Sequence, residues 1–141
     1  KVSTLSIFTN NVRVLVLAGL VSIFSFGSLA LLFTFLNIGL VSFVISEVVL
    51  VGINPWLFVV SFILPHGIFE IPALILGLAF ALRIGASVMA PPHDLKVGQA
   101  LLLALADFTK VMVFLVVPLL LLAAFIEANI TPQIVLAVYG S

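Results

Sequence analysis

Residues 14–46 read VLVLAGLVSIFSFGSLALLFTFLNIGLVSFVIS, and residues 48–69 read VVLVGINPWLFVVSFILPHGIF. Neither stretch contains Asp, Glu, Lys or Arg, and each is longer than the roughly 20 apolar residues that a membrane-spanning helix needs. The two stretches predict an all-α fold, a polytopic transmembrane helix bundle that contains short segments broken by proline and glycine.

The overall composition agrees with this prediction. Of 141 residues, 65% are hydrophobic and 7% are charged, whereas soluble domains average about 45–50% apolar and about 25% charged residues. We therefore expect a multi-pass protein of the cell membrane, surrounded by the lipid bilayer. Five basic residues balance five acidic ones, which leaves no basic surface for nucleic acid. The chain contains no cysteine, so disulfides and thiolate metal sites are excluded.

At about 20–25 residues per pass, the chain can supply four to six passes. We expect a single transmembrane domain over residues 1–141, with spans over about 12–36, 38–52, 66–88 and 110–127, a half-span over 56–64 and a short C-terminal segment over 132–140. Asn37 and Gly39 mark the expected division of the first charge-free stretch. Pro65 lacks a backbone donor, so the following helix is expected to start anew inside the membrane. The alternative is a proline kink within one long helix.

Two ionisable side chains lie at the end of the second stretch, His66 within it and Glu70 directly after it. A charged side chain at the centre of a membrane helix costs roughly 2.5–3.5 kcal/mol on insertion scales, so such groups usually pair, line a cavity or carry function. Residues four apart share a helix face, which places this pair together. The same face carries small residues at four-residue spacing, which favour close helix packing: Ala73, Gly77, Ala81 and Gly85.

The His66–Glu70 pair is open to three interpretations. It could bind a divalent cation such as zinc, but two ligands are too few, so Glu127, Glu47 or a residue from a second copy would have to complete the site. It could relay protons. It could also be a structural hydrogen-bonded pair that fixes helix packing. An enzyme is not expected, because the chain has no His-Glu-x-x-His, Gly-x-Ser-x-Gly or Walker motif, and we assign no catalytic residue.

Three stretches resemble the stage II sporulation protein M family: Asn10-Asn11, residues 64–70 (LPHGIFE) and residues 123–132 (AAFIEANITP). The family's usual Asn-Gly pair after the first span is Asn37-Ile38-Gly39 here. The resemblance implies a polytopic protein that, in sporulating bacteria, acts with peptidoglycan-degrading partners in an envelope-remodelling membrane complex. The compact chain is more similar to the archaeal members, which have no peptidoglycan to remodel.

Together these observations predict an intramembrane polar site formed by His66 and Glu70 with Glu127, Asn37 and Asn11. The first functional hypothesis is a transport or ion-binding protein that holds a cation or proton there. The alternative is a non-catalytic scaffold that assembles partner proteins in the membrane, with the polar residues holding its shape. The small-residue face could also serve a homodimer.

Overall fold

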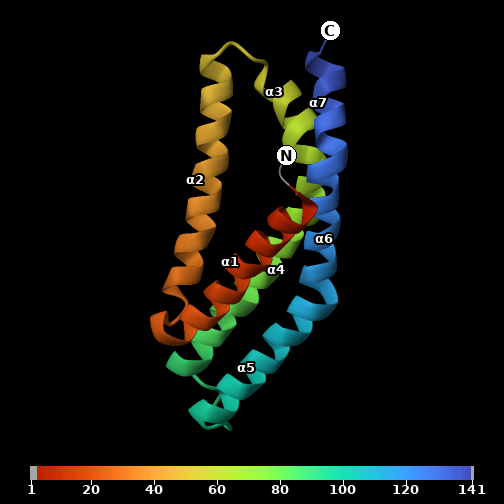
Figure 1. Cartoon of the computed structure of the whole chain (residues 1–141). Helices are drawn as coiled ribbons and strands as arrows, with labels where there is room; N and C mark the ends of the chain where they lie inside the picture. Colours follow the sequence, from red (N-terminus) through yellow and green to blue (C-terminus); the bar gives the residue numbers. More distant parts are fainter. Residues whose placement is uncertain (1–2, 141) are drawn as a thin grey trace.

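The computed structural model describes residues 3–140, and the regular structure in this range is helical, with no strand. Four long rods run alternately up and down (Figure 1). The first two are α1 (Thr4–Ser25) and α2 (Ser28–Leu50). The third joins α3 (Pro55–Phe58), the π-helical turn η1 (Val59–Ile63) and α4 (Leu64–Met89). The fourth joins α5 (Val97–Val111), η2 (Met112–Val116), α6 (Val117–Phe125), η3 (Ile126–Ile130) and α7 (Thr131–Tyr139).

All four rods are long and apolar enough to cross a membrane, which confirms the predicted all-α membrane fold. The rods comprise 22, 23, 35 and 43 residues in chain order. At about 1.5 Å per residue, the third and fourth exceed the roughly 30 Å of hydrocarbon in a bilayer. These two rods therefore extend beyond the lipid core or cross it at a tilt.

The first hairpin turns at Phe26 and Gly27, whose φ angles of 52° and 86° lie in the left-handed region. The expectation that the first span continues to residue 36 and divides at Asn37 is wrong, because residues 28–50 form one uninterrupted helix. The physical reason is a tertiary contact of the turn between α1 and α2. The turn lies directly on α4 at Gly85, where an added Cβ would collide with the backbone of Phe26 and Gly27. A glycine at that point of α4 allows the turn to form there.

Each of the three π-helical turns is followed by an α-helical segment whose second residue is a proline: Pro65, Pro118 and Pro132. Proline has no N–H to donate, and its ring collides with the carbonyl four residues earlier in a regular α-helix. A locally widened turn accommodates the ring without ending the helix. The half-span 56–64 and the separate segment 132–140 are therefore wrong as independent elements, because both belong to continuous rods.

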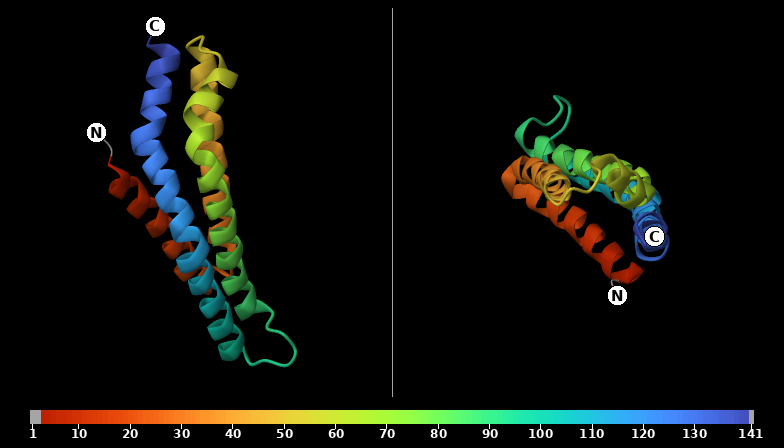
Figure 2. Two further views of the ribbon diagram at one scale, coloured as in Figure 1. Left: turned by 90° about the vertical axis from the view of Figure 1, so that its right-hand side faces the viewer. Right: turned by 90° about the horizontal axis from the view of Figure 1, so that it is seen from above.

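Helix α4 lies at the centre of the bundle, in contact with α1, α5 and α6. Side chains from these helices form the buried core: Leu15, Ala18, Ala73, Leu78, Ala81, Ile84, Phe108, Met112, Val116 and Leu120. In contrast, α2 keeps most of its side chains exposed, and only Ala30 and Val48 are buried. The N-terminal end of α1 lies at the outer side of the bundle, at about mid-height (Figure 2), and α1 contacts α4, α6 and η3.

Candidate functional site

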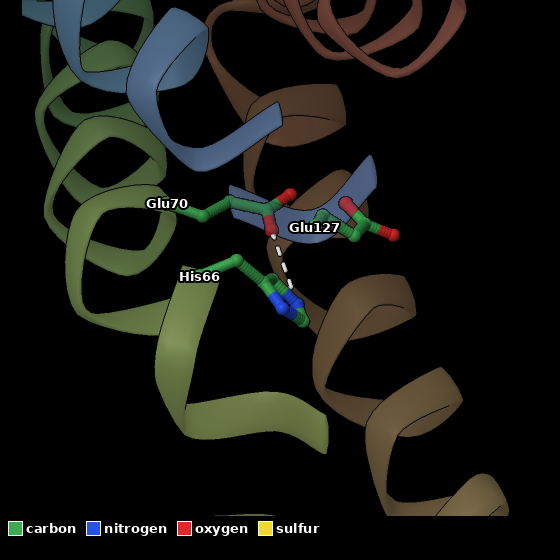
Figure 3. A group of neighbouring side chains, drawn as sticks. All are labelled: His66, Glu70 and Glu127. Atoms are coloured by element: carbon green, nitrogen blue, oxygen red, sulfur yellow. Dashed lines mark ion pairs between the residues drawn. The ribbon is translucent and has the colours of Figure 1, made fainter. Parts of the chain in front are cut away.

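Three ionisable side chains from two rods meet near the N-terminal end of α1. His66 and Glu70 project from α4, and Glu127 lies in η3 (Figure 3). The His66 Nε2 atom lies 3.8 Å from Glu70 Oε2. One ligand atom from each of the three residues lies within 4.8 Å of the others. The structure thus brings together the three residues that the sequence offered as metal ligands.

Two widened turns position these side chains. The π-helical turn η1 directly precedes α4 and ends three residues before His66, and η3 contains Glu127 itself. A widened turn changes the direction in which the following side chains leave the helix, and such turns occur often at functional sites. The prolines that widen η1 and η3 therefore also set how the third and fourth rods present their ionisable groups.

Helix α1 contributes amide and hydroxyl groups to the same region. Asn11 Nδ2 donates a hydrogen bond to Glu70 Oε1 at 2.9 Å, so Asn11 lies in direct contact with one of the residues of the predicted polar site. Asn129 Nδ2 donates to Thr4 Oγ1 at 3.1 Å and links η3 to the start of α1. Asn129 was not singled out from the sequence, although it lies two positions after Glu127 in the stretch that carries the family resemblance.

Burial leaves part of this group without a partner. The side chain of His66 is 11% exposed and that of Glu70 is 21% exposed. The Nδ1 atom of His66 is buried and has no hydrogen-bond partner among the residues described. An unsatisfied buried polar group costs about 1–3 kcal/mol. The imidazole therefore retains binding capacity that a ligand could use.

Two pockets adjoin the group. The first, of about 300 Å³, is lined by Ser6, Ile7, Asn10, Asn11, Glu70 and Glu127. The second, of about 520 Å³, is lined by Ile7, Phe62, Glu127, Ala128, Asn129, Thr131, Pro132, Gln133 and Leu136. Ile7 and Glu127 belong to both, so the pockets are neighbours. Within residues 3–140, neither pocket has a lysine or arginine in its lining.

Asn37 does not join this group, contrary to the sequence-based expectation. It lies within α2, where its Nδ2 donates to the Phe33 carbonyl at 2.8 Å, and it lines neither pocket. Because α2 begins at Ser28 rather than after Asn37, this amide sits inside a regular helix that satisfies it locally. Glu47, the other acid weighed as a ligand, is exposed near the end of α2.

The small residues of α4 serve packing in the structure. Ala73, Gly77, Ala81 and Gly85 are all buried. A Cβ added at Gly77 would lie 2.7 Å from Leu15 Cδ1, which shows how closely α1 approaches this face. The face holds α1 and its turn against α4, and thereby holds Asn11 at the polar group.

The basic side chains Arg83 and Lys110 lie at a different level and are largely exposed. Arg83 Nη1 lies 2.8 Å from Asp107 Oδ2, and Lys110 Nζ lies 3.9 Å from Asp107 Oδ1. Along α4, Arg83 is about 20 Å from Glu70, at about 1.5 Å per residue. Glu70 and Glu127 therefore have no basic side chain among the partners that the structure gives them.

The chemistry of the donor set suits a divalent cation. An imidazole nitrogen and two carboxylate oxygens are ordinary zinc ligands, at about 2.0–2.2 Å from the ion. In a tetrahedral site, such ligand atoms lie about 3.4 Å apart. Atoms that are now within 4.8 Å of one another would have to close by roughly 1 Å, which rotation of the glutamate side chains can supply.

Comparison with known proteins places the chain among its relatives. Residues 1–132 match the family described as Stage II sporulation protein M, and this range includes the whole polar group. The chain is 34% identical over 131 residues to an uncharacterized protein of Methanocaldococcus jannaschii, with 92% of this chain and 71% of the relative covered. No solved structure matches the chain. This protein belongs to the stage II sporulation protein M family.

Proposed function

We propose that this membrane protein binds a divalent cation, such as zinc, between His66, Glu70 and Glu127. The observation that carries the proposal is the convergence of one imidazole and two carboxylates from two rods to within 4.8 Å. Ionisable residues inside membrane-spanning helices are costly, and they are typical of sites that handle ions or substrates. A bound cation would balance both carboxylates and offset their cost of burial.

A purely structural His66–Glu70 pair explains the geometry less well. The 3.8 Å separation of Nε2 and Oε2 is longer than a hydrogen bond. A structural pair also gives no reason for a second carboxylate, that of Glu127, to approach from another rod. A cation accounts for all three groups at once, because each can supply one ligand atom.

The test is zinc binding to the purified protein in lipid nanodiscs, measured by isothermal titration calorimetry and by thermal unfolding. We expect one zinc ion per chain and a higher unfolding temperature when zinc is present. Glu70→Gln and Glu127→Gln should each weaken binding at least tenfold. Glu47→Gln is the matched control, because it removes a carboxylate on α2 outside the group.

Two results would contradict the proposal. One is wild-type protein that neither binds nor is stabilised by zinc. The other is a folded Glu127→Gln variant, verified by circular dichroism, that binds zinc as tightly as wild type. If the folded wild-type protein does not bind metal ions but carries a proton current that Glu70→Gln abolishes, then His66, Glu70 and Glu127 form a proton relay instead.

A second candidate function is a non-catalytic scaffold in which the polar residues hold the helices together. The hydrogen bonds from Asn11 to Glu70 and from Asn129 to Thr4 favour it, because both join α1 to another rod. A scaffold predicts that Glu70→Ala unfolds the protein and that no cation restores it. The cation site predicts that Glu70→Gln remains folded and loses only the metal-dependent stabilisation.

A further inference from the structure

The second pocket is apolar over most of its lining, which includes exposed side chains. Its volume of about 520 Å³ lies within the roughly 300–1,000 Å³ typical of small-molecule sites. Ile7, Ala128 and Pro132 form part of its wall. Phe62 and Leu136 are 40% and 71% exposed, so they lie at the rim rather than in the core. An apolar chain could enter between them from the surrounding lipid.

The lining of this pocket also includes a buried polar side chain. Thr131 lines it and is only 1% exposed, yet its Oγ1 atom has no hydrogen-bond partner in the described part of the chain. Leaving a buried hydroxyl unsatisfied costs about 1–3 kcal/mol. A polar atom of a ligand inside the pocket would satisfy it.

Glu127 connects the apolar pocket to the polar one. It lines both pockets, and Glu70 lines the polar pocket beside it. Within residues 3–140, no lysine or arginine lines either pocket, so the nearest charges that a ligand would meet are carboxylates. The combined site therefore has exposed apolar residues in the second pocket and the carboxylates of Glu70 and Glu127 in the first.

We propose that the two adjoining pockets bind an amphiphile that carries a single apolar chain and a primary ammonium head. The chain lies against Phe62, Pro132 and Leu136, and the head reaches Glu127. An ammonium group has three N–H donors. Glu127, which lines both pockets, can accept from it, and Glu70 in the first pocket and Thr131 in the second are the further acceptors nearby. The proposal shares its carboxylates with the proposed cation site but requires no metal ion.

The lining also discriminates among head groups. An anionic head would be repelled by Glu70 and Glu127, and a neutral head would leave both charges uncompensated. A quaternary ammonium has no N–H donor and is usually held by several aromatic rings, whereas Phe62 is the single aromatic residue in the lining of the second pocket. A primary ammonium is the head that fits this set of acceptors.

The test uses the full chain in lipid nanodiscs with four probes, and native mass spectrometry counts the bound molecules. Dodecylamine has both the chain and the head, dodecanol and dodecanoate share its chain, and ethylamine has only the head. We expect one dodecylamine per chain, with binding at least tenfold tighter than that of dodecanol or dodecanoate and no retained ethylamine. Equal binding of dodecylamine and dodecanol would overturn the proposal.

Two variants separate this inference from the proposed cation site. Ala128→Phe fills the apolar pocket without replacing a carboxylate, so it should lose dodecylamine at least tenfold and still bind zinc. Leu121→Phe is the matched control, because Leu121 is 50% exposed on α6 and lines neither pocket. If Ala128→Phe fails to fold, Leu136→Phe at the rim replaces it.

The two failures are distinguishable. Zinc binding without selective dodecylamine binding overturns the amphiphile site and leaves the cation site standing. Dodecylamine binding that depends on Glu127, in a protein that does not bind zinc, overturns the cation site and leaves the amphiphile site standing. If both ligands bind, zinc should displace dodecylamine, because they use the same carboxylates. Simultaneous binding without competition would contradict the shared site.

Discussion

Replacement of Gly85 by alanine tests the packing that fixes the whole bundle. A Cβ at this position would lie 2.8 Å from the Cα atom of Gly27 and closer still to the adjoining backbone of Phe26 and Gly27. Those atoms belong to the turn between α1 and α2, and backbone cannot rotate aside as a side-chain end can. The variant therefore has to push the turn away from α4.

The expected loss of stability follows from two opposing effects. Overpacking of a well-packed core costs typically 1–3 kcal/mol, and a clash with backbone belongs at the upper end, about 3 kcal/mol. Alanine is favoured over glycine inside a helix by up to about 1 kcal/mol. We therefore expect Gly85→Ala to lower the free energy of unfolding by about 2 kcal/mol.

The assay is denaturation of the purified protein in mixed micelles, followed by circular dichroism. Gly39→Ala is the matched control, because Gly39 lies inside α2 with nothing within 4 Å of an added Cβ. That control should be neutral or stabilising by up to about 1 kcal/mol, the helix-propensity gain alone. If Gly85→Ala is as stable as Gly39→Ala, the turn does not dock on α4 as described.

Two further predictions concern the same framework. Gly77→Ala should destabilise less than Gly85→Ala in the same denaturation assay, because its added Cβ meets the end of the Leu15 side chain, which can turn away. Arg83→Met should change the free energy of unfolding by at most about 1 kcal/mol, because the ion pair with Asp107 is partly exposed. A loss above about 2 kcal/mol, measured at low and high salt, would show that the ion pair is worth more than its exposure implies.

The composition predicts the fold class well, but local signals misplace the helix boundaries. Charge-free stretches longer than a membrane pass leave little alternative to apolar helices. The local signal predicts the first break at Asn37, a strong turn residue, yet the break occurs at Phe26 and Gly27. Nothing local separates Gly27 from Gly19 or Gly39, which both remain helical. What decides the position is the contact with Gly85, far along the chain.

One part of the candidate site can likewise be predicted from local sequence, whereas the other part depends on contacts between distant segments. The four-residue spacing alone is enough to set His66 beside Glu70 on one helix. The approach of Glu127 depends on how the fourth rod packs, and spacing within one helix cannot reveal it. The Thr131 hydroxyl also gave no signal, because its burial without a partner arises only when α7 lies against the third rod.

The three π-helical turns have a consequence for how the chain length can change. An i→i+5 turn contains about one residue more than an i→i+4 turn. Removal of one residue from Met112–Val116, combined with replacement of Pro118, whose ring needs the wider turn, would restore an ordinary turn and leave every side chain beyond it in its present orientation. The same deletion within the regular part of α5 would rotate all later side chains by about 100° about the axis and carry Glu127 away from the centre of the bundle. The wide turns are thus the places where this protein can lose a residue and keep its register.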